Sequence, residues 1–300
     1  MSFLSVKQLN TEQIEKLFQT ASFFKTKEVK PKLDDKIVSL IFFEPSTRTR
    51  MSFEVAALRL GVKTHLLNNK LGTSLEKDET LQDTVKNIAA MKPDLLVVRC
   101  NDDLDLAEMS KEVDVPILNA GWGTQGHPTQ ALLDILTVKE QQRGLLNKER
   151  ILFVGDVKHS RVVSSHLELA PLLGYQIGFC GPEEMLIDSP GVQKFNQLSE
   201  GLKWATTVYS LRVQFERYSQ KEKENQQLTT ANFISHFQLN AQALSSWSKE
   251  GLILHPGPVN YGVELAPEII KDSRNLILKQ VEHGVLVRMA LIYHFLKEQL

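Results

Sequence analysis

Residues 46–50 read Ser-Thr-Arg-Thr-Arg and combine hydroxyl and guanidinium groups in one short stretch. The apolar run before them, residues 37–43, predicts a buried strand, and the apolar spacing of residues 55–60 suits a helix. The first N–H groups of a helix have no partner within it, and the helix dipole favours an anion there. This stretch therefore suits a phosphate or similar oxyanion. An ordinary capped helix start with two solvated arginines is the alternative that local sequence leaves open.

Further polar residues follow the other apolar runs, at the points where strands are predicted to end. They are Arg99, His127 and residues 158–161, 212–214 and 255–258. Arg99 could form a salt bridge at the rim or belong to a site. His127 follows a glycine-rich loop, residues 121–126, and begins a predicted helix, where a neutral imidazole is favoured. A site of arginines, hydroxyls and one histidine, without a nucleophile–base pair, suits polyanionic substrates and catalysis by positioning and charge stabilisation.

The elements that must position these residues alternate between strand and helix patterns. The predicted strands span residues 37–43, 62–67, 95–100, 115–119, 151–155, 175–180, 208–211 and 252–254. The first predicted helix begins near Asn10, and a second covers residues 55–60. Further helices are predicted at residues 79–91, 108–113, 128–142, 161–173 and 284–300. Alternation of this kind predicts an α/β fold of two doubly wound parallel-sheet domains with helices on both faces, residues 1–143 and 144–283. Ligands bind beyond the carboxyl ends of such strands. Residues 218–230 have no apolar stripe and predict a surface loop, either closing over a ligand or serving as a solvated linker.

Composition limits the class of protein. The 300 residues are 42% hydrophobic and 24% charged with a net charge of -1, which argues against a general binder of nucleic acid or anionic membranes. The longest apolar runs are too short to span a bilayer, and the N-terminus does not read as a signal peptide. Cys100 and Cys180 fit reduced, buried thiols in a cytoplasmic protein.

Nucleotide and metal motifs are missing from the sequence. Residues 155–161 occupy the position of a dinucleotide turn but lack Gly-x-Gly-x-x-Gly, and there is no Gly-x-x-x-x-Gly-Lys-Ser/Thr. The histidines are dispersed and no cysteine–histidine cluster occurs. We therefore expect neither a metal nor a cofactor.

Five segments together resemble the aspartate/ornithine carbamoyltransferase family, the transcarbamoylases. Residues 43–54 (Phe-Glu-Pro-Ser-Thr-Arg-Thr-Arg-Met-Ser-Phe-Glu) resemble its carbamoyl-phosphate motif, and residues 127–130 (His-Pro-Thr-Gln) resemble its second motif. Residues 155–161, 211–217 and 255–258 are similar to the aspartate branch, whereas the His-Cys-Leu-Pro and Ser-Met-Gly segments typical of the ornithine branch are missing. The resemblance extends from Glu44 to Arg288, almost the whole chain.

The resemblance implies a site for carbamoyl phosphate in the first domain. Its phosphate would be bound by the residues of the first motif: Ser46, Thr47, Arg48 and Thr49. Arg99 would bridge the phosphate and the carbonyl oxygen, which Thr49 and His127 would also polarise. The carbamoyl amide would be bound by Gln130 and the backbone around Pro256, Gly257 and Pro258.

The resemblance also implies that L-aspartate accepts the carbamoyl group, giving N-carbamoyl-L-aspartate and phosphate for pyrimidine synthesis. Arg161 and Arg212, assisted by Gln214, would bind its two carboxylates. Ser74 and Lys77 would enter a neighbouring subunit's site, which implies a homotrimer with shared active sites and leaves a larger assembly open. Glu44 would pair with Arg161 on domain closure, and the last helix would return to the first domain.

Four residues depart from the pattern expected of the aspartate branch: Trp122, Gly126, Asp78 in place of a usual glycine, and Tyr261 in place of a common arginine. Three other functions remain as alternatives. They are a transcarbamoylase for another amino acid such as ornithine, a non-catalytic anion-binding relative, and a nucleotide-dependent oxidoreductase.

Overall fold

The computed structural model describes residues 2–26, 33–68, 78–141, 146–214, 217–218 and 229–297. The chain forms two compact units, one of Met1–Leu136 with Val281–Leu300 and the other of Thr137–Gln280. The domain boundary expected between residues 143 and 144 falls within residues 142–145, which lie outside the described residues.

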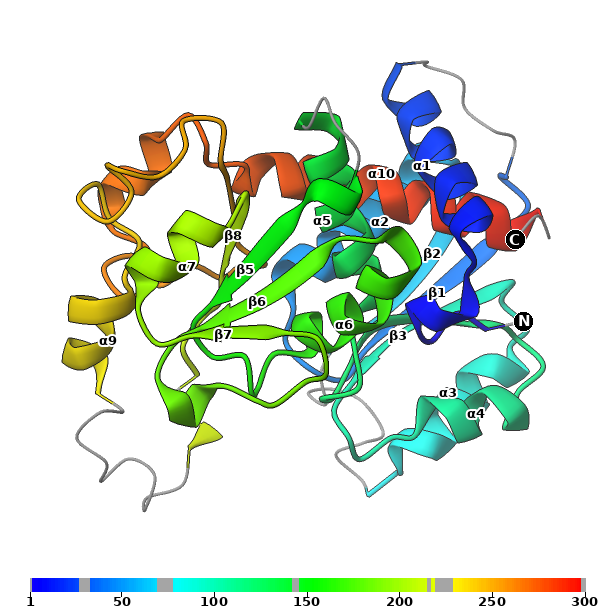
Figure 1. Cartoon of the computed structure of the whole chain (residues 1–300). Helices are drawn as coiled ribbons and strands as arrows, with labels where there is room; N and C mark the ends of the chain where they lie inside the picture. The colour runs from blue at the N-terminus through cyan, green and yellow to red at the C-terminus, as the bar shows by residue number, and fades with distance from the viewer. Residues whose placement is uncertain are drawn as a thin grey trace. The chain divides into compact units, whose positions relative to one another are not determined.

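A parallel sheet of order β2-β1-β3-β4 forms the centre of the first unit (Figure 1). Its strands are β1 (Ile37–Phe42), β2 (Lys63–Asn68), β3 (Leu95–Cys100) and β4 (Ile117–Trp122). The helices of this unit are α1 (Thr11–Thr26), α2 (Thr47–Arg59), α3 (Leu81–Ala90), α4 (Leu106–Glu112), most of α5 (Pro128–Gln141) and most of α10 (Ile277–Leu296), with a 3-10 turn η1 (Val6–Gln8). Strands β1, β3 and β4 read as continuous apolar runs because helices cover both faces of the sheet.

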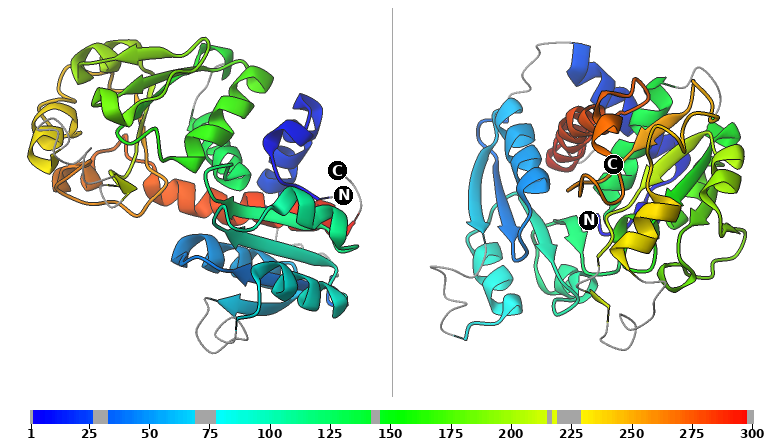
Figure 2. Two further views of the ribbon diagram at one scale, coloured as in Figure 1. Left: turned by 90° about the horizontal axis from the view of Figure 1, so that it is seen from below. Right: turned by 90° about the vertical axis from the view of Figure 1, so that its left-hand side faces the viewer.

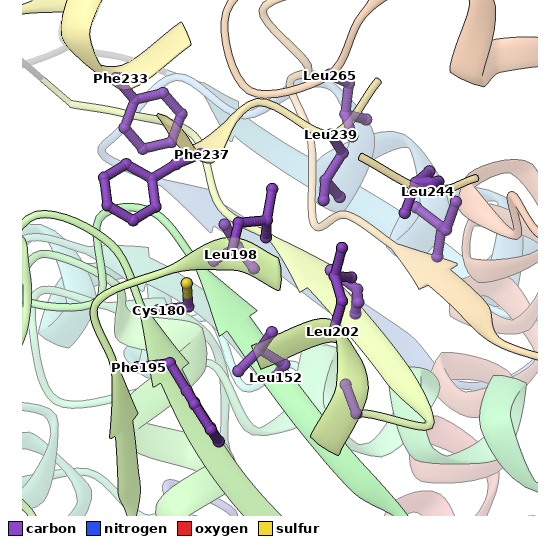
Figure 3. Close-up of a cluster of buried hydrophobic side chains, with 14 of the residues drawn as sticks. Leu152, Cys180, Phe195, Leu198, Leu202, Phe233, Phe237, Leu239, Leu244 and Leu265 are labelled. Atoms are coloured by element: carbon purple, nitrogen blue, oxygen red, sulfur yellow. The ribbon is translucent and has the colours of Figure 1, made fainter. Parts of the chain in front are cut away.

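The second unit has a parallel sheet of order β7-β6-β5-β8-β9. Its strands are β5 (Arg150–Val154), β6 (Gln176–Cys180), β7 (Gln193–Phe195), β8 (Thr207–Ser210) and β9 (Leu252–Leu254). Its helices are α6 (Arg161–Leu173), α7 (Leu198–Trp204) and α9 (Thr230–Phe237), with 3-10 turns η3 (Leu146–Lys148), η4 (Glu183–Met185) and η6 (Pro267–Lys271). On one face Leu152 and Cys180 of the sheet pack with Leu198 and Leu202 of α7 and with Phe233 of α9 (Figure 3).

The predicted α/β fold with two parallel sheets is confirmed. Strand β3 and helix α6 have the predicted bounds, and Cys100 and Cys180 are buried free thiols. The prediction missed β7, α7 and α9 and placed the start of the last helix too late, at residue 284 instead of Ile277. Most of the loop predicted at 218–230, residues 219–228, lies outside the described residues. Within the described ranges, no helix has both the length and the apolar character needed to cross a bilayer.

The first and last long helices, α1 and α10, lie side by side in the first unit (Figures 1 and 2). Helix α1 begins with the predicted capping box, in which Asn10 and Gln13 exchange two hydrogen bonds of 2.9 Å. Phe24 packs edge-on against Tyr293 with ring centroids 5.6 Å apart. The last helix therefore returns to the first unit, as expected.

His294 of α10 should make the protein less stable in mild acid. Its Nε2 lies 2.8 Å from the Thr20 hydroxyl, and burial, followed by the charge of Lys16, lowers the pKa of His294 from 6.5 to about 4. Between these values the unfolded chain binds a proton that the folded chain does not, so the free energy of unfolding falls as the pH drops from 6.5 towards 4. Thermal unfolding of a His294→Gln variant should show a weaker pH dependence of Tm across this window. The matched variant of an exposed histidine, His236→Gln, should behave as wild type; equal pH dependence in all three proteins would contradict this assignment.

Candidate functional site

The carboxyl ends of β1, β3 and β4 form one edge of the first sheet. The β1–β3 register pairs Phe42 with Arg99, and the Phe43 N–H donates to the Arg99 carbonyl at 2.9 Å. Residues 46–50 leave β1 at this edge, and His127 follows β4. Three of the segments singled out in the sequence therefore meet at the expected edge of this sheet.

The start of α2 does not have the usual side-chain cap. Ser46 occupies the N-cap position in an extended conformation (φ -159°, ψ 97°), but its side chain makes no capping hydrogen bond. Thr47 and Arg48 are exposed, whereas Thr49 is buried. A hydroxyl that does not cap leaves the first N–H groups of α2 available to another acceptor, which favours the oxyanion interpretation over the ordinary helix start.

Arg99 lies at the end of β3 with its side chain only 13% exposed. Its Nε is 3.5 Å from Glu44 Oε2, and its Nη1 donates to the Ala120 carbonyl at 3.3 Å. The rim salt bridge considered from the sequence is thus present. It also places the guanidinium at the same sheet edge as the start of α2, where its role in a site stays a prediction.

The glycine-rich loop before α5 is shaped by Asp102. The Asp102 carboxylate accepts the Thr124 N–H at 3.0 Å, and a Cβ on Gly123 would lie 1.9 Å from Asp102 Oδ1, so any other residue would displace this carboxylate. Gly123 has a φ of +41°, which also favours glycine. Trp122 and Gly126, two of the unusual residues, exchange backbone hydrogen bonds across the loop.

His127 follows this loop and is buried at the start of α5. Its Nε2 lies 3.5 Å from the Thr49 hydroxyl, and its Nδ1 lies 3.5 Å from the Thr129 hydroxyl. The imidazole therefore connects the start of α2 with the start of α5. It is placed to donate a hydrogen bond towards an oxyanion bound at α2.

Two buried charged residues near the start of α5, Asp134 of α5 and Arg288 of α10, were not predicted from the sequence. Asp134 Oδ1 accepts the Gln130 amide N–H at 2.9 Å, and Arg288 of α10 donates to the Thr129 hydroxyl at 3.2 Å. Burial lowers the pKa of Arg288 to about 9, while the Asp134 charge opposes this shift. A signal for Asp134 was its place four residues after Gln130 on one helix face, and a signal for Arg288 was an arginine within an apolar stripe.

In the second unit, hydrogen bonds of Asp156 connect two segments. One follows β5 and contains Arg161, and the other follows β8 and contains Arg212 and Gln214. Asp156 is fully buried after β5 and accepts the Tyr218 hydroxyl at 2.8 Å and the Gln214 N–H at 3.2 Å. Arg161 begins α6 after β5, and Arg212 follows β8, the neighbouring strand. Both arginines therefore leave the same edge of the second sheet. The sequence signal for Asp156, a carboxylate just after the predicted strand, was overlooked.

The residue 255–258 turn after β9 is fixed by a buried histidine–carboxylate pair. The Gly257 N–H donates to His255 Nδ1 at 2.7 Å, so the ring proton lies on Nε2, which donates to Glu264 Oε1 at 3.2 Å. Glu264 Oε1 also accepts the Asn260 N–H at 2.7 Å. The Gly257–Pro258 peptide bond of this turn is cis.

Replacing Glu264 with alanine should destabilise this turn. The His255 donor to Glu264 is buried and the Asn260 N–H is half-buried, and an unpaired buried donor costs about 1–3 kcal/mol. We expect Glu264→Ala to lower Tm by several degrees and Glu264→Gln, which keeps an acceptor at Oε1, to recover most of the loss. Thermal unfolding by circular dichroism measures both; an equal loss in the two variants would show that the charge, not the acceptor, matters.

Two predicted site residues, Ser74 and Lys77, lie outside the described residues. Asp78, the next residue, has a φ of +66°, a conformation that explains why glycine is usual there. Tyr261 is 48% exposed. Among the described side chains, no group of three histidines, cysteines or carboxylates is arranged to bind a metal ion.

Comparison with known proteins agrees with this arrangement of two units. Residues 1–140 match the model of the aspartate/ornithine carbamoyltransferase carbamoyl-P binding domain, and residues 147–295 match that of the Asp/Orn binding domain. The aspartate carbamoyltransferase catalytic subunit of Christiangramia forsetii is 40% identical, covering 97% of this chain and 94% of the relative. That of Helicobacter acinonychis is 38% identical, covering 96% of each.

Solved structures of both branches share the fold. Ornithine carbamoyltransferase from Thermus thermophilus has a TM-score of 0.84 at 26% identity, covering 98% of each chain. Aspartate transcarbamoylase from Trypanosoma cruzi, in complex with carbamoyl phosphate and aspartate, has a TM-score of 0.83 at 29% identity, covering 97% of this chain and 95% of that chain. The fold alone therefore does not separate the branches, whereas the named sequence relatives are aspartate enzymes. This chain belongs to the aspartate/ornithine carbamoyltransferase family.

Proposed function

We propose that this chain transfers the carbamoyl group of carbamoyl phosphate to the amine of L-aspartate, giving N-carbamoyl-L-aspartate and phosphate in pyrimidine synthesis. The observation that supports it most strongly is the uncapped start of α2 beside the Thr49–His127 contact of 3.5 Å. An oxyanion site and a carbonyl-polarising pair at one sheet edge match the two ends of carbamoyl phosphate.

In this proposal the first unit binds carbamoyl phosphate. Ser46, Thr47, Arg48 and the Thr49 N–H bind the phosphate oxygens, and Arg99 bridges the phosphate and the carbonyl oxygen. The Gln130 N–H already donates to Asp134 at 2.9 Å, which leaves its carbonyl oxygen to accept the carbamoyl N–H. By resemblance to the family, the backbone of Gly257 and Pro258, which belong to the second unit, would also bind this amide.

The second unit binds L-aspartate in this proposal. Arg161 and Arg212 each bind one carboxylate as a planar fork, and Gln214, fixed by Asp156, assists. The neutral amine attacks the carbonyl carbon, and a C–N bond forms as the C=O electron pair moves onto oxygen. Thr49, Arg99 and His127 stabilise that charge. The electron pair then returns, the C–O bond to phosphate breaks, and phosphate leaves with a proton from the amine.

We also propose a cytoplasmic homotrimer in which Ser74 and Lys77 enter the neighbouring subunit's site. The resemblance of the chain to the family, from which the roles of Ser74 and Lys77 are carried over, supports this assembly. The mass of the protein in solution tests it, with three chain masses expected. Two variants mixed in one sample, Lys77→Ala and Arg48→Ala, should regain activity after subunit exchange if the sites are shared, and should stay inactive if each chain has a complete site.

Phosphate release tests the reaction itself. Purified protein with carbamoyl phosphate should release phosphate in the presence of L-aspartate, and the rate with L-ornithine should not exceed the background without an amino acid. A preference for L-ornithine would overturn the branch assignment. If carbamoyl phosphate binds but neither amino acid causes phosphate release, the result would favour a non-catalytic relative.

A further inference from the structure

Arg288 is a buried charge with an unusual neighbour for an arginine, a threonine hydroxyl at the start of another helix. Its side chain is 3% exposed, its guanidinium lies 5.0 Å from the ring centroid of Phe53, and its Nη2 is 3.2 Å from Thr129 Oγ1. Burial lowers the pKa of Arg288 to about 9, with Asp134 raising it and Arg99 lowering it. The guanidinium is therefore still charged at pH 7 and can only donate a hydrogen bond to Thr129.

The hydrogen bond from Arg288 determines which way the Thr129 hydroxyl hydrogen points, and His127 lies on that side. A hydroxyl has one hydrogen and two lone pairs, and Arg288 occupies one of the lone pairs. Within the described part of the chain, the buried Thr129 hydroxyl has two side-chain hydrogen-bond partners, Arg288 and His127 Nδ1, the latter at 3.5 Å. Its hydrogen therefore points to Nδ1. The opposite arrangement, with the proton on Nδ1, would leave the Thr129 hydrogen without an acceptor in a buried place.

The other ring nitrogen faces the proposed carbonyl site. His127 Nε2 lies 3.5 Å from Thr49 Oγ1, and the positive end of the α5 dipole disfavours a second proton on the ring. An Nδ1 that accepts a hydrogen bond places the single proton of the neutral ring on Nε2. Only that tautomer can donate to a carbonyl oxygen beside Thr49.

We propose that Arg288, acting through the Thr129 hydroxyl, sets the tautomer of His127 and so presents an Nε2–H to the carbamoyl oxygen. Arg288 and Thr129 are then positioning residues, and neither touches the substrate. The catalytic use of this proton rests on the proposed function, whereas the tautomer itself does not.

Nitrogen-15 spectra of the histidine rings test the proposal directly. In protein labelled with 15N-histidine at pH 7, two-bond proton–nitrogen correlations, assigned with a His127→Gln variant, should show the proton of His127 on Nε2. Thr129→Val removes the hydroxyl at nearly constant volume. In this variant the Nδ1 resonance should shift and the Nδ1–H tautomer should become populated. Its kcat should fall about two- to tenfold, the worth of one ordinary hydrogen bond, with little change in KM for carbamoyl phosphate.

Conservative variants separate this role from simple packing. Thr129→Ser and Arg288→Lys keep the hydroxyl and the donor, so both should recover the wild-type His127 spectrum, whereas Arg288→Met should behave as Thr129→Val. If Arg288→Met fails to fold, the comparison of Thr129→Val with Thr129→Ser still tests the proposal. A proton on Nδ1 in the wild type, or an Nδ1 resonance unchanged in Thr129→Val, would overturn the proposal. Wild-type protein with the predicted tautomer but no phosphate release would count against the proposed function alone.

Discussion

Replacing Arg99 with alanine is expected to lower kcat about 10²- to 10³-fold, because one donor to the developing oxyanion is removed. The effect should appear mainly in kcat, since Arg48 and the start of α2 would still bind the phosphate. Arg99→Lys keeps a charge but loses the planar fork, so its kcat should lie between those of wild type and the alanine variant. Steady-state phosphate release at saturating L-aspartate measures all three proteins.

The Arg99 experiment needs a structural control, because Arg99 also contacts Glu44 at 3.5 Å and the Ala120 carbonyl at 3.3 Å. Tm and circular dichroism report whether the end of β3 stays intact. Lys111→Ala breaks an exposed ion pair with Glu108 at the surface and should leave kcat unchanged. A kcat for Arg99→Ala within twofold of wild type would remove Arg99 from the proposed mechanism.

Arg48→Ala and Arg212→Ala are each expected to weaken the binding of a different substrate. A charge-assisted hydrogen bond contributes about 1.5–3 kcal/mol, which corresponds to a roughly 10- to 100-fold change in affinity. Arg48→Ala should lower the affinity for carbamoyl phosphate by this factor. Arg212→Ala should leave the affinity for carbamoyl phosphate unchanged and raise KM for L-aspartate. Calorimetric titration with carbamoyl phosphate and steady-state kinetics in L-aspartate measure the two effects separately.

These two variants control for each other because the arginines belong to different compact units. A general loss of folding in one variant would weaken the binding of both substrates, and a lowered Tm would reveal it. If Arg212→Ala weakened carbamoyl phosphate as strongly as Arg48→Ala does, the assignment of one substrate to each unit would be wrong. Wild-type kinetics in both variants would contradict the whole site.

The sequence predicted those elements that a local apolar pattern marks clearly. Strand β3, helix α6 and the three-residue strand β9 have apolar patterns with clear ends, and their bounds agree with the structure. β7 has one buried residue among its three and so no apolar run, and α7 has a glycine, Gly201, inside its seven residues. Gly284 was taken for the start of the last helix, but it lies inside α10. A Cβ there would lie 2.7 Å from Arg288 Nη1, so a larger residue would push this guanidinium aside.

The position of a candidate residue at a sheet edge was predictable where it lies at or just after the end of a strand, as Arg99 in β3 and Arg212 after β8 do. The carboxyl ends of parallel strands meet at one edge, so order along the chain already indicates proximity. The supporting residues were not predictable in this way. Arg288 contacts Thr129 across 159 residues of sequence, and Glu264 contacts His255 only because the turn after β9 folds back. Such contacts depend on packing between elements, which periodicity does not encode.

The central claim is that L-aspartate is the acceptor, and a single competition reaction tests it most directly. Wild-type protein receives carbamoyl phosphate labelled with 13C in the carbamoyl group, together with equal concentrations of L-aspartate and L-ornithine. The label should appear in N-carbamoyl-L-aspartate, and phosphate should form in equal amount. Label in the carbamoyl derivative of ornithine instead would contradict it.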